Sequence, residues 1–196
     1  MECWARSPFL GKRVSQLQMD AYSQFVRAAE AKDETEITRL IREHPNLHSI
    51  SGDDGSLLDI LRYNCPELFA IAFAAGLGPD SGPPLPHHTL LQHAVSDNHV
   101  ELARLCLRHG ADVERRNCEG ETALGYAVSW GSLDTVRLLI EAGADVNAIE
   151  GTRENFYSTA LDACSSHTDN DRSEIREYLR SHGAKRYSEL STPSPD

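Results

Sequence analysis

The fold is indicated by residues 121–146, "ETALGYAVSWGSLDTVRLLIEAGADV", because the same pattern occurs once earlier in the chain. Residues 88–113, "HTLLQHAVSDNHVELARLCLRHGADV", align with them without a gap at a shift of 33 residues. The match holds at both ends, and it includes Gly-Ala-Asp at 110–112 and again at 143–145. Self-similarity at a fixed period of this length is the signature of a repeat architecture.

Each unit predicts two short helices joined by a tight turn. The hydroxyl of Thr122 stands where it can cap the first helix, and Gly131 permits the turn. Gly143 follows the second helix as a C′ residue, where a left-handed backbone costs little. The remaining apolar positions recur at helical spacing: Leu124, Ala127 and Val128 form one face of the first helix, and the second helix is built from Leu133, Val136, Leu138, Leu139 and Ile140. We expect Val128, Leu133 and Leu139 in the core.

These motifs resemble the ankyrin repeat. Thr122 to Gly125 ("TALG") and Thr89 to Gln92 ("TLLQ") stand where that family has Thr-Pro-Leu-His, and both lack the Pro and the His. Residues 143–147 keep Gly-Ala-Asp-Val-Asn, whereas Glu114 replaces the Asn in the earlier copy. The resemblance implies an all-α solenoid of stacked helix–turn–helix units with short hairpin-like loops.

Weaker copies on both sides extend the array to about five repeats. We expect them at 20–48, 53–80, 85–116, 117–149 and 150–186, numbered one to five, with an N-terminal extension at 1–19 and a disordered tail at 187–196. The segment 77–88 contains four prolines and two glycines, which predicts an extended connector between repeats two and three. The ending "IREYLRSHGAKRYSEL" resembles the closing repeats of bacterial stand-alone ankyrin proteins.

Composition excludes several classes of function. The formal net charge of −11 argues against a nucleic-acid binder, which needs clustered Lys and Arg to replace phosphate counterions. The five cysteines are odd in number and form no CxxC pair, so we expect reduced thiols rather than disulfides or a zinc site. No apolar run reaches the length of a signal peptide or a membrane span. These features favour a soluble, cytoplasmic protein that does not bind membranes.

Nothing in the sequence predicts catalysis, a metal site or a cofactor. His87, His88, His93 and His99 lie close together, but they lack the spacing of a helical metal site with a third ligand. Cys106 is expected in the core, because it aligns with Leu139. The stretch "SSHTD" at 165–169 contains Ser, His and Asp, but a catalytic triad is assembled in space rather than by adjacency.

The resemblance implies a binding surface made by the loops before the first helices and by the exposed ends of those helices. The loop candidates are His88, Arg115, Arg116, Cys118, Glu119, Glu121, Ile149, Glu150, Phe156 and Tyr157, and the helix-end candidates are Tyr63, Asn64, Asp97, Ser129, Trp130 and His167. The alternative for each is a solvated loop residue. For Trp130 a second alternative is a ring that packs over the neighbouring repeat.

Charge and aromatic residues suggest the type of partner. Eight acidic and two basic residues between 117 and 163 contribute −6 of the net charge of −11. An acidic rim with aromatic anchors suits a protein partner with a basic surface. Two hypotheses follow for a chain that is monomeric on its own: a specific inhibitor, for instance an immunity protein against a basic toxin or enzyme, or a regulatory adaptor in a signalling pathway. An enzyme with a site in the insertions of repeat five is a third and weaker hypothesis.

Overall fold

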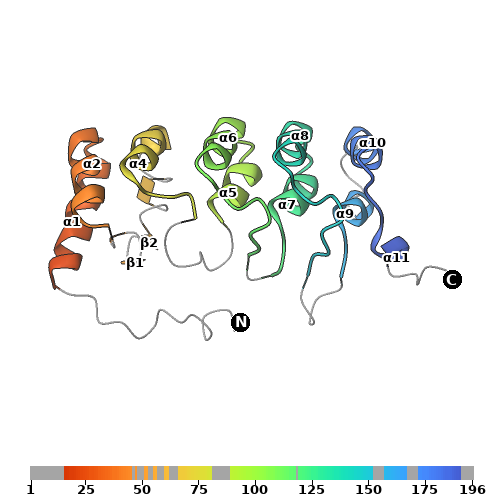
Figure 1. Cartoon of the computed structure of the whole chain (residues 1–196), viewed down its shortest axis with the longest axis horizontal. Coiled ribbons are helices and arrows are strands. Elements are labelled where there is room, and N and C mark those ends of the chain that lie inside the picture. Colours follow the sequence, from red (N-terminus) through yellow and green to blue (C-terminus); the bar gives the residue numbers. More distant parts are fainter. Residues whose placement is uncertain are drawn as a thin grey trace. The chain divides into compact units, whose positions relative to one another are not determined.

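The computed structural model describes residues 16–45, 47, 51–52, 55–56, 60–61, 66–80, 89–117, 119–151, 157–166 and 172–190. The chain forms two compact units, one of residues 1–86 with 109–111 and one of residues 87–108 with 112–196. The first boundary falls inside the segment 77–88, which the sequence predicts as a connector. Helix pairs make up the described part of both units (Figure 1).

The described part of unit 1 contains one helix pair, a short pair of strands and a further helix. Its elements are α1 (Gln16–Glu30), α2 (Glu34–Glu43), β1 (Ser51–Gly52), β2 (Gly55–Ser56), η3 (Pro66–Leu68) and α4 (Phe69–Ala75). The two short strands pair antiparallel, with Ser51 opposite Ser56. Helix α1 begins at Gln16, inside the stretch that we expected as an extension, and helix α2 is capped by Asp33, which accepts the Glu36 amide at 3.0 Å. Phe25, Ile37, Leu40 and Phe69 form the core.

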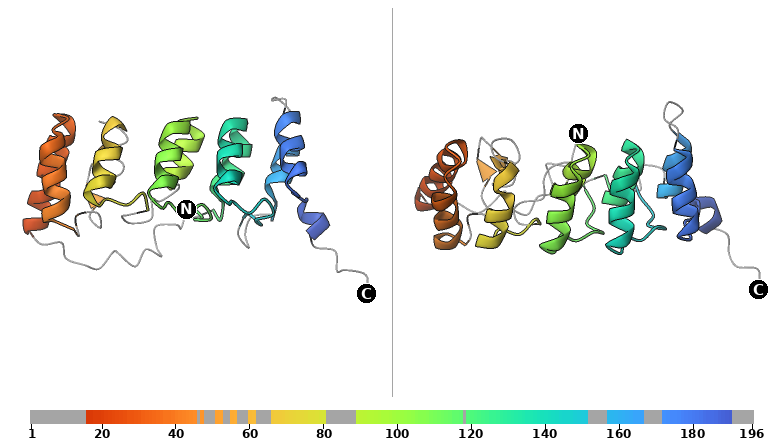
Figure 2. Two further views of the ribbon diagram at one scale, coloured as in Figure 1. Left: turned by 45° about the horizontal axis from the view of Figure 1, so that its top comes forward. Right: turned by 90° about the horizontal axis from the view of Figure 1, so that it is seen from above.

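Unit 2 contains three helix pairs and a short closing helix. The pairs are α5 (Leu90–Ser96) with α6 (Val100–Arg108), α7 (Ala123–Trp130) with α8 (Leu133–Glu141), and α9 (Ala160–Ser166) with α10 (Ser173–Ser181). The first helices α5, α7 and α9 pack side by side, and the second helices α6, α8 and α10 form a second layer on them. The loops between successive pairs leave the helices on one side (Figure 2).

Local signals in the sequence explain where these helices begin and end. Thr122 accepts a hydrogen bond from the Gly125 amide at 3.3 Å, and Thr89 accepts one from the Gln92 amide at 3.1 Å, so both threonines cap as predicted. Gly131 and Gly143 have φ of +75° and +94°, a backbone region that favours glycine. The predicted turn and C′ positions are therefore confirmed.

The core of unit 2 follows the predicted apolar spacing with two exceptions. Leu124, Val128, Val136 and Leu139 are buried, and so is Cys106, as its alignment with Leu139 predicts; Leu91, Val95, Leu161 and Leu179 fill the equivalent space in the neighbouring repeats. Leu133 and Ile140 are only half-buried. They lie in the first and last turns of α8, so the prediction that Leu133 is a core residue is wrong.

Residues 187–190 are helical, whereas we expected them to belong to a disordered tail. Tyr187–Leu190 form α11, which is held to repeat five by a hydrogen bond of 2.8 Å from the Tyr187 amide to Asp162 Oδ2. Glu189 accepts two hydrogen bonds of 3.1 Å from Arg180. These long-range contacts order residues 187–190, and residues 191–196 lie outside the described part. Within the described residues, no helix combines the length and the apolar character that a membrane crossing requires.

Candidate protein-binding surface

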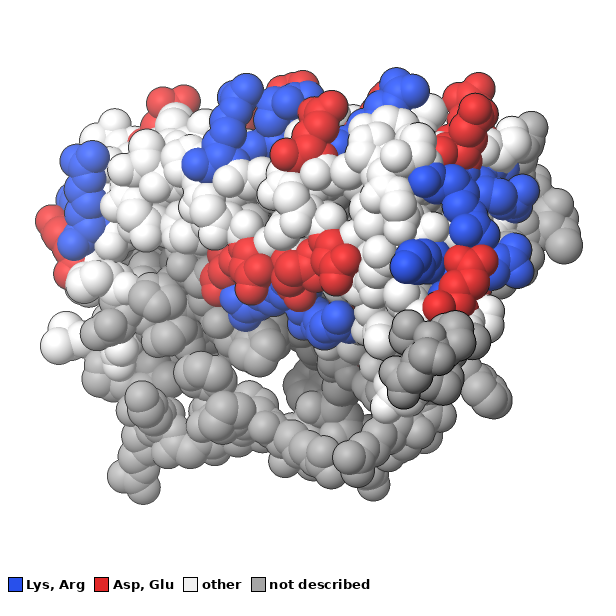
Figure 3. All heavy atoms as spheres, turned by 45° about the vertical axis from the view of Figure 1, so that its right-hand side comes forward, with Lys and Arg blue, Asp and Glu red and all other residues white. Residues whose placement is uncertain are grey.

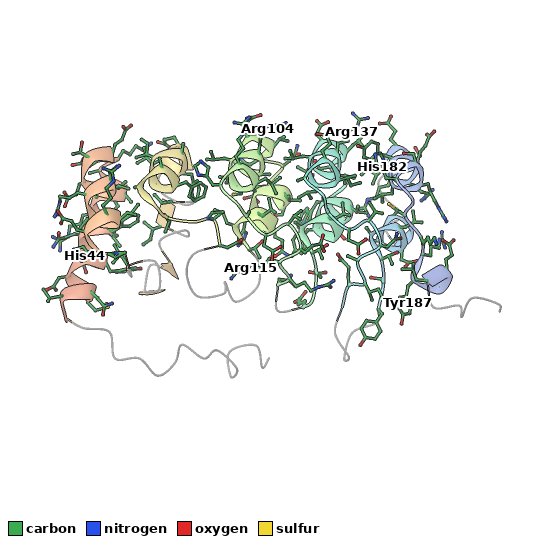
Figure 4. The ribbon with its side chains drawn as sticks, viewed as in Figure 1. His44, Arg104, Arg115, Arg137, His182 and Tyr187 are labelled. Carbon is green, nitrogen blue, oxygen red and sulfur yellow. The ribbon has the colours of Figure 1, made fainter. Side chains whose placement is uncertain are left out.

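The candidate residues that the structure describes all belong to unit 2, and they form two groups at opposite ends of α7. The finger group lies in the loops before the first helices, next to the N-cap Thr122. The helix-end group surrounds Trp130, the last residue of α7. A helix of this length separates its two ends by roughly 12 Å. Figure 4 shows Arg115 and Tyr187 on the loop side of unit 2, and Arg104, Arg137 and His182 on the opposite side.

Asn117 organises the first finger loop, residues 115–121. Its Oδ1 accepts the amides of Glu119 at 3.0 Å and Glu121 at 2.9 Å, and its Nδ2 donates to Glu121 Oε2 at 2.9 Å. The carboxylate of Glu121 is therefore half-buried and engaged within the loop. The side chain of Glu119 is exposed, so of these two predicted acidic contacts Glu119 is the one that faces solvent.

Arg116 joins the first finger loop to the second, residues 148–158, of which 148–151 and 157–158 are described. Its Nη1 donates to the carbonyl oxygens of Gly120 at 2.7 Å and Ile149 at 2.6 Å. This fixes the backbone beside Ile149, whose side chain is 43% exposed. Arg115, predicted at the same loop tip, is half-buried.

In the first and third Thr-x-Leu-x motifs, the fourth residue connects its repeat to the next stretch of chain. Gln92 accepts the Thr89 amide at 2.8 Å and donates to the Glu121 carbonyl at 2.7 Å. Asp162 accepts from the Thr159 amide at 3.0 Å and from the Tyr187 amide. The fourth residue of the middle motif is Gly125, which has no side chain to do this.

Glu150 connects the repeats in the place of Gly125. Its Oε1 accepts hydrogen bonds from the Thr122 amide at 3.2 Å and the Thr122 hydroxyl at 2.5 Å, and the residue is only 8% exposed. Burial raises the pKa of the Glu150 carboxyl, while the bonds from Thr122 act in the opposite direction. The prediction that Glu150 lies on the exposed rim is wrong, because this carboxyl folds back under the helix.

The helix-end group is centred on Trp130, whose side chain is 60% exposed. Hydrogen bonds to both neighbouring repeats hold the chain beside it, one through the backbone of Ser129 and one through the side chain of Ser132. Arg172 Nη2 donates to the Ser129 carbonyl at 2.6 Å, and Ser132 Oγ donates to Asn98 Oδ1 at 2.7 Å. Asp97, the C-cap of α5, is exposed at the equivalent position one repeat earlier. The indole therefore projects from a fixed backbone.

Sequence reasoning missed two residues at this surface. Arg172 is 6% exposed, and it also donates to the Ala163 carbonyl at 3.3 Å. Tyr187 stacks against Tyr157, with ring centroids 5.8 Å apart, and Tyr157 is 44% exposed. No period could reveal Arg172, since it lies in an insertion, and the only signal for Tyr187 was an aromatic residue in the expected tail.

Several predicted residues lie outside the described part of the chain: Tyr63, Asn64, His88, Cys118, Phe156 and His167. Among the residues that the structure does describe, no group of three or more His, Cys, Asp or Glu side chains could hold a metal ion.

The charged side chains on the face that Figure 3 presents are of both signs. A group of Asp and Glu lies directly above a group of Lys and Arg at the centre of the view. Around the first finger loop, Glu119 and Asp112 are exposed acids and Arg116 is an exposed base. Acidic side chains therefore adjoin basic ones on this face.

A search of curated protein sequences finds no significant match. The family model for ankyrin repeats matches residues 25–150 with three copies. This match covers more than half of the chain, and it includes the two repeats whose caps, turns and core are described above. The chain belongs to the ankyrin-repeat family.

Proposed function

We propose that this chain is a non-catalytic protein-binding module that contacts its partner through the finger and helix-end groups of unit 2. Ankyrin repeats generally mediate protein–protein interactions. The observation that supports this site best is Trp130, whose indole is 60% exposed on a chain segment that hydrogen bonds to both neighbouring repeats hold in place. Asp97 occupies the same position one repeat earlier, so the fold does not need an aromatic residue there.

The exposure of Trp130 favours a partner contact over packing against the next repeat. A tryptophan buries about 150–250 Å² when it is fully covered, and aromatic side chains on ordered backbone dominate the binding energy of many interfaces. Ile149 and Tyr157 are two further large hydrophobic side chains that unit 2 exposes, and both lie at the finger loops. The partner is therefore expected to cover apolar side chains at both ends of α7.

A partner with a basic surface fits the charge of the chain. The net charge of −11 and the exposed carboxylates of Glu119 and Asp112 support this choice. Arg116 contributes one opposing positive charge, and its guanidinium is already bonded to two backbone carbonyls. Complementary charge of this kind acts mainly on the association rate and on the choice of partner.

We propose two forms of this function. In the first, the chain is a monomeric cytoplasmic protein that specifically inhibits a basic protein, such as a toxin or enzyme. In the second, it is an adaptor. The separation of the two groups across α7 gives the adaptor hypothesis its support, because two partners could bind without overlap. An inhibitor uses both groups on one partner. Loss of the same partner on substituting either Trp130 or Tyr157 supports inhibition, and loss of different partners supports the adaptor.

The test begins with affinity purification of the full chain and mass spectrometry, comparing wild type with Trp130→Ala. The partner identified is then purified, and direct binding is measured by surface plasmon resonance at two salt concentrations. Trp130→Ala is expected to lower the affinity by at least tenfold. Glu119→Lys is expected to slow association and weaken its salt dependence, whereas Glu141→Lys, on the exposed face of α8, is the matched control. Unchanged affinity for Trp130→Ala would exclude the proposed surface.

A further inference from the structure

Gly125 and Glu150 share one space in unit 2. A Cβ atom placed on Gly125 would lie 1.8 Å from Glu150 Oε2, 2.3 Å from its Cδ and 2.4 Å from its Oε1. Any side chain at position 125 therefore displaces the carboxyl of Glu150 from its site beneath α7.

The backbone gives no reason for a glycine at position 125. Gly125 is the third residue of α7, and its φ is not among the positive values of the structure. Glycine within a helix is less favourable than alanine, because it loses more conformational freedom on folding. Helix geometry therefore does not explain the glycine at position 125. The space that the Glu150 carboxyl occupies does explain it, because any side chain at 125 would fill that space.

The two residues reverse the arrangement found one repeat earlier. At the shift of 33 residues, Gly125 corresponds to Gln92 and Glu150 to Asn117. There, the helix residue Gln92 reaches out to the Glu121 carbonyl, and Asn117 organises its own loop. In the following repeat, the loop residue Glu150 accepts hydrogen bonds from Thr122, and the helix residue Gly125 leaves space for its carboxyl.

Glu150 also forms the base of the second finger loop. Its amide donates to the Ser158 carbonyl at 2.8 Å, and the Ser158 amide donates back at 3.3 Å. Ile149 and Tyr157, the exposed hydrophobic residues of this loop, are the direct neighbours of these two paired residues. A shift of Glu150 therefore moves the backbone that presents both side chains.

We propose that Glu150 is a positioning residue of the binding surface: its carboxyl, seated in the space left by Gly125 and bonded to Thr122, holds the second finger loop so that Ile149 and Tyr157 face the partner. The part that concerns the partner rests on the proposed function. The seating of the loop does not, and it is tested without a partner.

The test is the exchange rate of the Glu150 and Ser158 amides with deuterium, measured by NMR on the full chain. Gly125→Ala is expected to speed exchange of both amides at least tenfold in the wild-type background, because its Cβ expels the carboxyl. In a Glu150→Ala background the same substitution is expected to slow exchange, since alanine favours the helix and nothing is displaced. The effect of Gly125→Ala on the exchange rate changes sign between the two backgrounds only if the side chains at positions 125 and 150 compete for the same space.

Two further variants keep the test decisive if Glu150→Ala fails to fold. Glu150→Gln retains an oxygen that accepts both Thr122 hydrogen bonds, and it is expected to keep wild-type protection. The pair Gly125→Gln with Glu150→Asn recreates the arrangement of Gln92 and Asn117, and it is expected to restore protection to within threefold of wild type. Glu141→Ala is the control for removal of an exposed carboxylate.

The proposal would be overturned if Gly125→Ala changed the exchange rate equally in both backgrounds, or if no substitution changed the exchange rate. Either result leaves the function of Trp130 untouched, because the exchange measurement needs no partner. The two parts of the proposal can also be separated. If the exchange rates show the sign reversal but Tyr157→Ala does not change the affinity for the purified partner, the seating of the loop is supported. The proposed use of the loop in binding is then contradicted.

Discussion

The guanidinium of Arg172 donates a hydrogen bond of 2.6 Å to the backbone carbonyl oxygen of Ser129, 43 residues earlier in the chain. A second bond reaches the Ala163 carbonyl in α9. Carbonyls in the last turn of a helix have no partner within the helix, and a cation is favourable at this end of the helix dipole. One buried arginine thereby ties repeat five to the helix end that carries Trp130.

Replacing Arg172 should weaken this connection. Arg172→Met keeps much of the buried volume but removes the bonds to the two carbonyls, and we expect it to lower the free energy of unfolding by about 1–3 kcal/mol. Denaturation with urea measures the change. Arg176→Met is the comparison, because Arg176 is exposed and bonds only the Cys164 carbonyl at 3.1 Å among the contacts described. An equal loss for both variants would contradict the role given to Arg172.

Gln92→Glu should destabilise the contact between repeats three and four. The substitution keeps the shape of the side chain, but it removes the amide that donates to the Glu121 carbonyl and places a carboxylate at a fully buried position. We expect a loss of roughly 2 kcal/mol in the free energy of unfolding near neutral pH. Thermal unfolding followed by circular dichroism provides the measurement, and partial recovery at low pH is expected because the carboxyl becomes neutral.

Trp130→Ala should leave the fold intact. An exposed side chain contributes little to packing, so the free energy of unfolding is expected to change by less than about 0.5 kcal/mol. Leu139→Ala, at a fully buried position of α8, is expected to cost about 3 kcal/mol in the same assay. If the two variants lost similar stability, the indole would be a packing residue, and its use as a binding anchor would have to be abandoned.

The stability of the chain should depend on pH through Glu150. Burial raises the pKa of this carboxyl, Glu121 adds to the rise, and Thr122 and Arg116 oppose it. Because the folded pKa lies above the unfolded one, the contribution of Glu150 is fully present below the unfolded value and is lost as pH rises through the folded value. Glu150→Gln has no such loss, so its stability relative to wild type should increase as pH rises above about 4, where a carboxyl in the unfolded chain titrates.

Urea titrations of both proteins at several pH values give this difference directly. Glu141→Gln, which removes an exposed carboxyl, supplies the baseline. A difference between Glu150→Gln and wild type that stays constant across the range would show that Glu150 titrates as an ordinary carboxyl.

Cys164 should resist thiol reagents in the folded chain. Its side chain is buried, and this burial raises the pKa of the thiol against the opposing charges of Arg176 and Arg172. Peptide mapping after alkylation with iodoacetamide is expected to find Cys164 unmodified until denaturant is added. Rapid native-state modification would show that repeat five opens locally.

Sequence periodicity was sufficient for the parts of the fold that recur. Thr122, Gly131 and Gly143 act locally, within one repeat, and their capping and turn roles followed from residue type and position. The exposed end of the first helix at Trp130 followed from the same register. These features depend on contacts between residues a few positions apart, which a sequence displays directly.

The features that escaped prediction depend on contacts between repeats. The loop position of Glu150 predicts exposure on the rim, whereas the missing side chain of Gly125, 25 residues earlier, leaves room for its carboxyl in a buried site. Arg172 lies in a segment that matches no other repeat, and α11 is ordered by Asp162 and Arg180. For Glu150, Arg172 and Tyr187 the deciding partner lies at least 25 residues away along the chain and follows no period.

The closing helix α11 also limits where further repeats can be added to this protein. Asp162 stands where Gln92 reaches toward the loop of the following repeat, yet it accepts the amide of Tyr187, and the Thr159 hydroxyl donates to the Lys185 carbonyl at 2.8 Å. Residues 185–187 thus occupy the place where the loop of a following repeat would bind. Duplication of a repeat at this position, whether in evolution or in engineering, must first displace them.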